Sequence, residues 1–376
     1  MKKSRIVCVI ILVLIVLFFV FVPPTIRPIR VAYKELGIPS SEQFPTGVRA
    51  RSPWDLSLWN DALYVGSGDF DANTGPANVL KYDLQSKTWG VDATLPEEEI
   101  NRFLVIDGRL TIVGIDPQES WELGNYYLLR DGEWTQKRVI PNGVHTFDMT
   151  AFNGAIFAGL GVPTGEYPIA VSRDGGETFE PVEMHKDGAP IDTSGSELIR
   201  VYDLFVFRGN LYAMFLYGDK SPRPVELYRY DDGCFVFDAS WTDQIKFKPI
   251  SYLPVRAKAE YKGHLYLTSG NLYVSDDAKT LTKINFPNNE TVFDFTIEKG
   301  VLYALCARKL ENGTIRTSVW RQIGWNADSF AELFYFDYAL PPLSIATDGK
   351  TFYIGASYTT LEHELNGTIL QIEYKK

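Results

Sequence analysis

Short apolar runs separated by polar turns recur along the chain after residue 50. In the clearest copies, an aromatic residue and an aspartate stand at the start of one run, and a polar two-residue turn leads to a second run that contains a Leu or Ile beside a Tyr or Phe. Two runs joined by such a turn are typical of a β-hairpin. The four clearest copies span residues 53–64, 146–157, 201–212 and 292–303.

Three weaker copies, at residues 106–110, 261–266 and 347–353, bring the number of repeats to seven. Each repeat is long enough for four strands and three turns. Self-similarity at this spacing is typical of radial arrays, so we predict an all-β, seven-bladed β-propeller of four-stranded antiparallel blades. The predicted blades start near residues 53, 101, 146, 201, 256, 292 and 343.

The last repeat ends after its third run, at residues 369–374. Its fourth strand must therefore come from elsewhere in the chain. The segment between Gly37 and Arg51 is the only piece without an assignment, so we expect an N-terminal strand from that segment to close the last blade. No linker interrupts the repeats, and the predicted propeller domain spans residues 37–376.

The N-terminus carries a membrane signal. Three basic residues within the first five positions precede seventeen apolar residues, 6–22, and two prolines follow. This pattern is typical of a signal peptide or a signal anchor. Because no small residues mark a cleavage site, we expect an uncleaved transmembrane helix, 1–24, and a stalk, 25–36. The basic residues before the span predict a single-pass protein of the cell membrane with its propeller outside the cytoplasm.

Composition narrows the class of partner. Aromatic residues make up 14% of the chain, which suits strands, and the formal net charge is -10. A surface with this charge repels phosphate backbones, so we expect no nucleic-acid partner.

One segment carries a recognisable motif. Residues 172–179 match the Asp-box of the BNR, sialidase-like propellers, a serine, an aspartate, a glycine and a threonine followed by an aromatic residue, at every defining position. The matching residues are Ser172, Asp174, Gly176, Thr178 and Phe179. Residues 82–89 are similar to the end of a kelch repeat. The chain thus resembles the Asp-box and kelch-like class of propellers, and in sialidases the box has a structural role.

Aligning the repeats on their Leu-Tyr pairs places seven residues at one equivalent position, four of them acidic. In a propeller the first strand of each blade is innermost, so this position lies at one end of the central channel. We predict a ligand site formed by Asp55, Arg102, Asp148, Asp203 and Asp294. An acidic ring of this kind binds a cationic group or Ca²⁺. The alternative is that each aspartate caps the amides of a neighbouring loop.

The sequence lacks the usual signs of an enzyme. No histidine pair has metal-ligand spacing, no serine stands in a nucleophile elbow, and no glycine-rich phosphate loop precedes a helix. We therefore expect no catalytic residue, no metal and no cofactor other than the Ca²⁺ left open above. The leading hypothesis is a non-catalytic propeller that binds a glycan or protein at the cell surface. The alternatives are a glycan hydrolase or lyase that uses Asp148 and Asp203 as an acid/base pair, and an assembly factor for a membrane protein.

Overall fold

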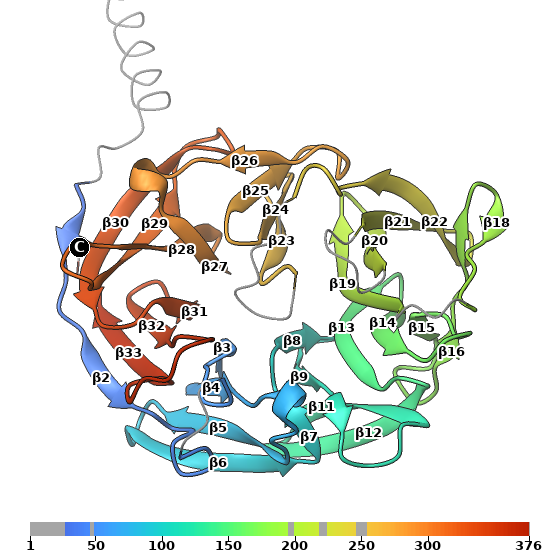
Figure 1. Ribbon diagram of the computed structural model, residues 1–376, viewed down its shortest axis with the longest axis horizontal. Coiled ribbons are helices and arrows are strands. Elements are labelled where there is room, and N and C mark those ends of the chain that lie inside the picture. The colour runs from blue at the N-terminus through green and yellow to red at the C-terminus, as the bar shows by residue number, and fades with distance from the viewer. Residues whose placement is uncertain (1–26, 46–48, 195–198, 218–223, 246–253, 376) are drawn as a thin grey trace, which may run out of the picture.

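The structure is a computed structural model that describes residues 27–45, 49–194, 199–217, 224–245 and 254–375. These residues form strands β1 to β33 and two short 3-10 helices, η1 (Phe70–Ala72) and η2 (Pro287–Asn289), so the fold is all-β. The sheets stand around a common centre, and the first strand of each repeat lies nearest to that centre (Figure 1). The protein is a β-propeller with antiparallel blades.

Five sheets are separate blades. The first contains β3 (Asp55–Trp59), β4 (Ala62–Gly66), β5 (Ala77–Asp83) and β6 (Thr88–Leu95). The second contains β8 (Phe103–Ile106), β9 (Arg109–Val113), β11 (Leu123–Arg130) and β12 (Glu133–Pro141). Later in the chain come the sheet of β23 (Lys258–Tyr261), β24 (His264–Thr268), β25 (Leu272–Ser275) and β26 (Thr282–Ile284), and the sheet of β27 (Thr291–Glu298), β28 (Val301–Lys309), β29 (Ile315–Gln322) and β30 (Phe330–Tyr338). The last contains β31 (Pro342–Thr347), β32 (Thr351–Ala356) and β33 (Thr368–Glu373).

Two further repeats lie in one twelve-stranded sheet. One is formed by β13 (His145–Phe152), β14 (Ala155–Val162), β15 (Ile169–Ser172) and β16 (Glu180–Pro181), and the other by β19 (Ile199–Phe207), β20 (Asn210–Tyr217), β21 (Val225–Asp231) and β22 (Cys234–Ser240). Four short strands extend this sheet: β7 (Glu97–Glu99), β10 (Ile115–Pro117), β17 (Met184–Lys186) and β18 (Ala189–Pro190).

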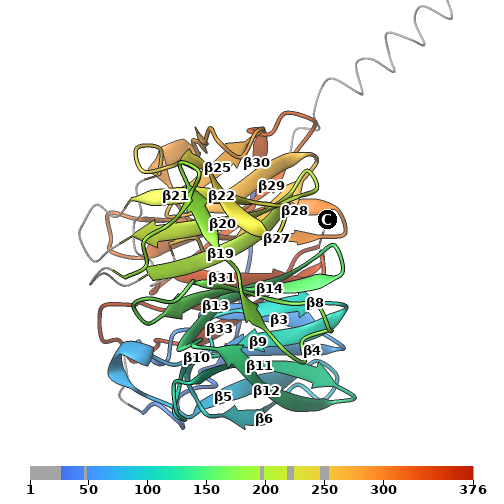
Figure 2. The same cartoon turned by 90° about the vertical axis from the view of Figure 1, so that its right-hand side faces the viewer.

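The prediction of seven independent blades therefore needs a correction, because five blades are separate and two repeats are joined. The joint is a short antiparallel pairing between β14 and β19, in which Gly161 pairs with Arg200 and Val162 with Ile199. Val162 extends one residue past the pairing of β14 with β13, whereas Ile199 is still paired with Tyr217 of β20. Figure 2 shows the ring from its side, with β5 and β6 at the bottom and β25 and β30 at the top.

The N-terminal prediction also needs a correction. The fourth strand of the last sheet is β2 (Lys34–Gly37), which pairs antiparallel with β33, and β1 (Ile29–Arg30) pairs parallel with β30. All residues of these two strands except Gly37 were assigned to the stalk, 25–36, so the closing strand lies almost entirely before the segment between Gly37 and Arg51. The predicted transmembrane helix, 1–24, lies outside the described residues. Among the residues that are described, no helix has the length and apolar character needed to cross a membrane.

Local sequence explains the hairpins. In the tight turn after each of the first six inner strands, both central residues have positive φ, for example 49° at Asn153 and 77° at Gly154. This is the type I′ geometry that follows the twist of a hairpin, and asparagine and glycine adopt it at low cost. The turns therefore set the register of each inner hairpin.

A β-bulge explains the repeated aromatic-Asp pair. In four inner strands the register shifts by one residue immediately before the equivalent position. In β13, Thr146 pairs with Leu160 and Asp148 with Gly159, so Phe147 has no partner across the hairpin. A bulge changes the direction of the side chain that follows it. The side chains of Asp148, Asp203, Asp294 and Ser344 therefore do not follow the regular alternation between the two faces of the strand.

The turn at residues 172–179 is held by one carboxylate. Asp174 accepts hydrogen bonds from the backbone amides of Glu177 and Thr178, both at 3.0 Å, and from the hydroxyls of Ser172 and Thr178 at 2.7 and 2.6 Å. These bonds, with that of the Thr178 hydroxyl first, lower the pKa of Asp174. Phe179 is buried and packs edge-on against Tyr126 of β11. The turn therefore fastens the β15–β16 hairpin to the preceding blade.

Candidate functional site

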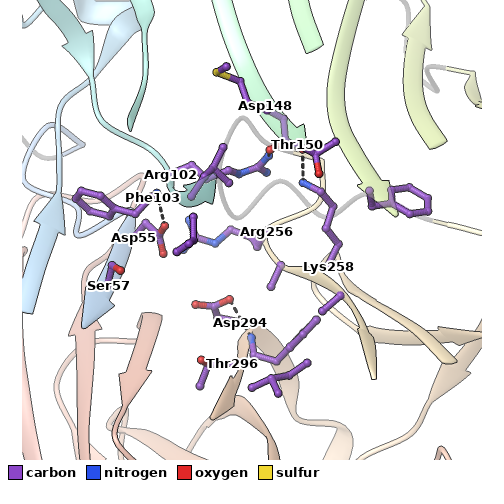
Figure 3. Close-up of a pocket in the computed structure, with 18 of the residues that line it drawn as sticks. Asp55, Ser57, Arg102, Phe103, Asp148, Thr150, Arg256, Lys258, Asp294 and Thr296 are labelled. Carbon is purple, nitrogen blue, oxygen red and sulfur yellow. Dashed lines mark hydrogen bonds and ion pairs between the residues drawn. The ribbon is translucent and has the colours of Figure 1, made fainter. Parts of the chain in front are cut away.

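The equivalent positions of the inner strands meet around an axial cavity of about 450 Å³. Asp55, Arg102, Asp148 and Asp294 line it, and Figure 3 shows them converging from separate inner strands. Asp203 lies against the same group, because it pairs with Arg102. The structure thus brings together all five predicted ligand residues. We call Asp55, Arg102, Asp148, Asp203, Arg256, Lys258 and Asp294 the cavity floor.

Three of the floor aspartates join neighbouring inner strands. The Asp55 carboxylate accepts a hydrogen bond from the Phe103 amide at 2.7 Å. Asp148 accepts one from the amide of Leu204 at 2.7 Å, and Asp294 accepts one from the amide of Ile345 at 3.1 Å. In each case the amide belongs to the residue after the equivalent position of the next inner strand. Each carboxylate therefore accepts a hydrogen bond from a backbone amide that has no partner strand at the inner edge of its sheet.

A serine makes the corresponding contact where the ring closes. Ser344 occupies the equivalent position of the last repeat, and its hydroxyl donates to the Pro53 carbonyl at 2.7 Å. Pro53 lies directly before the first inner strand, so this bond joins the C-terminal repeat to the N-terminal one. The repeated position thus has a structural role in the blades that carry an aspartate and in the one that carries a serine.

Arg102 and Lys258 neutralise two of the aspartates. Arg102 forms ion pairs with Asp148 at 3.1 Å and with Asp203 at 3.0 Å, and Lys258 forms ion pairs with the same two residues at 2.7 and 2.6 Å. Both carboxylates are 1% exposed. Burial opposes the charge of Arg102, but Asp148 and Asp203 outweigh it and raise the pKa of the guanidinium. These four side chains form a closed, charge-balanced group.

Arg102 also donates hydrogen bonds to backbone carbonyls of residues that lie much later in the sequence. Its guanidinium donates to the carbonyls of Phe147 at 3.3 Å, Tyr202 at 3.5 Å and Val255 at 3.2 Å. These carbonyls lie in three successive repeats after that of Arg102. One side chain therefore links four repeats at the axis.

The other side of the floor is built around Arg256. Its guanidinium donates to the carbonyls of Trp54 and, at 3.0 Å, Leu343. Burial lowers the pKa of Arg256, while the carboxylates of Asp294 and Asp55 counteract that shift. Burial also raises the pKa of Asp55, and raises that of Asp294 to about 7. Asp294 therefore takes up a proton near neutral pH.

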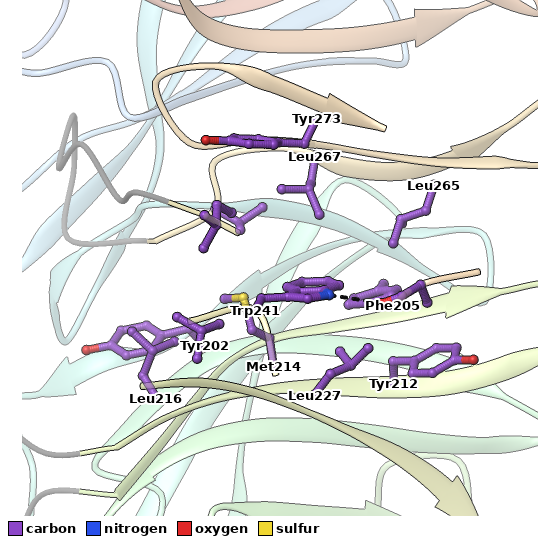
Figure 4. Packing of buried hydrophobic residues seen from close by; sticks show 14 of the residues in the cluster. Tyr202, Phe205, Tyr212, Met214, Leu216, Leu227, Trp241, Leu265, Leu267 and Tyr273 are labelled. Carbon is purple, nitrogen blue, oxygen red and sulfur yellow. Dashed lines mark hydrogen bonds between the residues drawn. The ribbon is translucent and has the colours of Figure 1, made fainter. Parts of the chain in front are cut away.

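Packing between the repeats holds the inner strands in place. Phe205 of β19 stacks on the Trp241 ring, with 6.1 Å between the ring centroids and 11° between the planes. The Trp241 indole is fully buried and donates to the Ala278 carbonyl at 3.0 Å. Figure 4 shows Trp241 between side chains of β19 to β21 and Leu265 and Leu267 of β24. This contact fixes the strand of Asp203 against the sheet that carries Lys258.

The floor has few groups left for an exogenous ion. Among the residues that the structure describes, no group of three His, Cys, Asp or Glu side chains has an arrangement suited to a metal ion. Floor carboxylates instead accept hydrogen bonds from amides, and two of them are ion-paired to buried cations. The capping interpretation, which the sequence offered as an alternative to an acidic ring, describes these contacts.

The cavity wall beyond the floor carries three hydroxyl groups among apolar side chains such as Leu104 and Val206. Ser57, Thr150 and Thr296 each lie two residues after a floor aspartate and line the cavity (Figure 3). A hydroxyl both donates and accepts hydrogen bonds. The wall therefore offers hydroxyl groups beside a floor whose carboxylates are already hydrogen-bonded or ion-paired, which suits recognition of an uncharged polar group.

A second polar centre was missed in the sequence. β7 is a run of three glutamates, and Glu97 and Glu99 are 0% and 2% exposed. Glu97 accepts hydrogen bonds from the Asn125 amide and the Tyr127 hydroxyl, both at 2.7 Å. The Oε2 atoms of Glu97 and Glu99 are buried without a hydrogen-bond partner among the described residues. Consecutive glutamates usually face solvent, so the sequence did not predict their burial. The only available signal was that this run lies shortly before an inner strand.

Burial changes the protonation of this centre. It raises the pKa of Glu97 to about 7, an effect that the hydrogen bonds from Asn125 and Tyr127 partly offset. It raises the pKa of Glu99 to about 8, although the Arg49 guanidinium counteracts the shift. Such shifts follow from the cost of a charge in a dry interior. The strand is therefore a proton-binding element near neutral pH.

Comparison with protein families and with curated proteins found no match. Among solved structures, a catalytically inactive virginiamycin B lyase from Staphylococcus aureus with quinupristin is 11% identical, with 92% of this chain and 100% of that chain covered at a TM-score of 0.53. The extracellular domain of a protein assigned to the hybrid two-component systems of B. thetaiotaomicron is 10% identical, with 92% and 42% covered at a TM-score of 0.54. At these identities the likeness shows the propeller fold alone.

Proposed function

We propose that this protein is a membrane-anchored propeller that lies outside the cytoplasm and binds a glycan or protein at the cell surface, without catalysis of its own. The seventeen apolar residues at positions 6–22 and the basic residues before them support the anchor and its orientation. If the two repeats joined in the twelve-stranded sheet count as one blade each, the ring has seven blades. We place it with the Asp-box and kelch-like class on the Asp-box at residues 172–179 and the kelch-like segment at residues 82–89.

The observation that carries this proposal is the contrast between the floor and the wall of the axial cavity. The floor carboxylates are engaged with backbone amides and buried cations, while three wall hydroxyls face the cavity. A volume of about 450 Å³ lies in the range of small-ligand sites. We therefore assign the cavity to one polar group of a larger ligand, such as a sugar residue or a side chain.

The same contrast weakens the hydrolase or lyase alternative. A pair of catalytic carboxylates works at a separation of about 5–10 Å in an open site. Asp148 and Asp203 are instead 1% exposed and share Arg102 and Lys258 as ion-pair partners. The proposed function also needs no Ca²⁺, because Arg102 and Lys258 pair with Asp148 and Asp203 while Asp55 and Asp294 accept hydrogen bonds from backbone amides.

The test uses the full chain in detergent micelles and an array of surface glycans and secreted peptides. We expect binding that Thr150→Val and Thr296→Val each weaken, because each variant removes a wall hydroxyl and keeps the side-chain shape. Incubation with the bound glycans should release no product. Product release abolished by Asp148→Asn would establish the enzyme instead, and no binding together with co-purification of a membrane protein would favour the assembly factor.

Orientation is tested separately in intact cells. A protease added outside should digest the propeller, and digestion that requires permeabilised cells would reject the proposed location.

A further inference from the structure

The loop between β29 and β30 presents an exposed tryptophan. Trp325 lies in residues 323–329 and is 79% exposed, more than any other large hydrophobic residue among those described. A tryptophan carries a large apolar ring surface, which is costly to leave in water. An exposed ring of this kind is available to stack on a ligand.

The loop is fixed by hydrogen bonds on both sides of Trp325. Tyr266 and Lys262 of the preceding blade hold it at two points, and Gln322 holds it at two more. The bonds are Lys262 Nζ to the Gly324 carbonyl at 2.9 Å, Tyr266 hydroxyl to the Ala327 carbonyl at 2.9 Å, and Gln322 Nε2 to the carbonyls of Ile323 at 3.1 Å and Asn326 at 2.9 Å. A ligand that binds here therefore does not have to order the loop first.

A cationic pocket of about 240 Å³ lies at the start of the loop. Tyr261, Lys262 and Arg321 line it together with Gly324, and no acidic residue is among its lining residues. Among the described residues, no carboxylate forms an ion pair with Arg321. Arg321 and Lys262 therefore give the pocket positive charge without a carboxylate in its lining, which suits an anion.

A second pocket, of about 220 Å³, lies at the end of the loop. Ala327 lines it with Asp276, Thr280 and Thr282, and no basic residue is among its lining residues. Carboxylate and hydroxyl oxygens accept hydrogen bonds from ligand hydroxyls. Gly324 of the first pocket and Ala327 of the second are three residues apart, so these two lining residues are at most about 11 Å from each other.

We propose that the Trp325 loop is a binding site for an acidic saccharide. One sugar ring stacks on Trp325, and its carboxylate lies against Arg321. The neighbouring ring contacts Asp276 through its hydroxyls, and any carboxylate on that ring points to solvent, away from Asp276 and Asp277. The combination of a flat apolar surface, an anion pocket and a hydroxyl-binding pocket within the span of a disaccharide is what identifies this ligand class. The site is separate from the axial cavity and goes beyond the function assigned to it.

The test titrates digalacturonate and its dimethyl ester into the full chain in detergent micelles, with binding measured by calorimetry. The ester keeps the rings and hydroxyls and loses both charges. We expect the acid to bind about tenfold more tightly than the ester. Trp325→Ala should weaken binding of both by about tenfold or more, and Arg321→Gln should reduce the affinity of the acid to that of the ester.

Matched variants separate this site from others. Trp121→Ala removes a tryptophan that is 61% exposed on another loop, and Thr150→Val alters the axial cavity, so neither should change binding of digalacturonate. Equal affinity for acid and ester, or unchanged binding in Trp325→Ala, would overturn the proposal. Binding of triglutamate without binding of digalacturonate would also overturn it, in favour of an acidic peptide. Loss of binding in Thr150→Val alone would locate the ligand in the axial cavity.

Discussion

Replacing Glu97 with glutamine should make the protein less sensitive to alkaline pH. Glu97 is fully buried, and one of its oxygens accepts both of its hydrogen bonds. A glutamine retains that carbonyl oxygen and cannot ionise. In the protonated glutamate, the oxygen without a hydrogen-bond partner can carry the proton. The NH₂ group of glutamine takes the place of that hydroxyl, so the variant is a close replacement at low pH.

The magnitude follows from the pKa. Burial raises the pKa of Glu97 from 4.5 to about 7. Between these two values the folded chain keeps a proton that the unfolded chain releases, so the free energy of unfolding falls as the pH rises. The stabilisation is complete below pH 4.5 and is lost once the pH passes about 7. At about 1.4 kcal/mol for each pKa unit, the loss attributable to Glu97 is about 3 kcal/mol.

The assay is urea unfolding followed by tryptophan fluorescence at pH 5 and pH 8.5. Glu99 and Asp294 also have raised pKa values, about 8 and about 7, so the wild-type protein should lose stability for several reasons. The informative quantity is the difference between wild type and Glu97→Gln, which should favour the variant by about 2–3 kcal/mol at pH 8.5 and be small at pH 5. Glu133→Gln, at an exposed position of β12, is the control and should match wild type at both pH values. A variant with the same pH dependence as wild type would show that Glu97 does not hold a proton in the folded protein.

Three other substitutions test the packing of the site. Asp148→Ala should lower the free energy of unfolding by about 3–5 kcal/mol, equally with calcium and with chelator in thermal melts; stabilisation by calcium that the variant abolishes would instead support an ion at the floor. Gly114→Ala should cost about 1–3 kcal/mol, because its Cβ atom would lie 2.8 Å from a Glu97 oxygen, and melting like that of wild type would contradict this close approach. Ser344→Ala, which removes the bond to Pro53, should cost about 1 kcal/mol and expose the C-terminal repeat to faster hydrogen exchange, whereas unchanged exchange would show that this bond does not hold the ring closed.

Some features of the fold could be predicted from the sequence because they depend on residues that are neighbours in the chain. The hairpin turns require positive φ at two adjacent positions, and pairs such as Asn153-Gly154 supply it. The aromatic-Asp pair recurs because a bulge separates the two residues from the regular pairing of the strand. Repetition of these local units was sufficient to predict a propeller.

The number of separate blades could not be predicted from local sequence. Joining two repeats into one sheet depends on two residue pairs between β14 and β19, and these strands are distant parts of the chain that meet only in the folded ring. The closing strand was placed too late in the sequence for a related reason. Lys34–Gly37 has no strong strand pattern of its own, and its pairing with β33 is what makes it a strand.

The residues at the equivalent position of the site could be predicted from the sequence, because that position follows from the repeat. Their chemistry could not, because it depends on contacts between repeats. Arg102 contacts Asp203 and the Val255 carbonyl, partners that lie 101 and 153 residues away, and Lys258 completes the same group. The ring therefore neutralises Asp148 and Asp203 with Arg102 and Lys258, while burial raises the pKa values of Glu97 and Glu99 in β7. The protonation and ion pairing of a side chain depend on the groups that surround it in space. A repeat pattern does not show which side chains of other repeats those groups are.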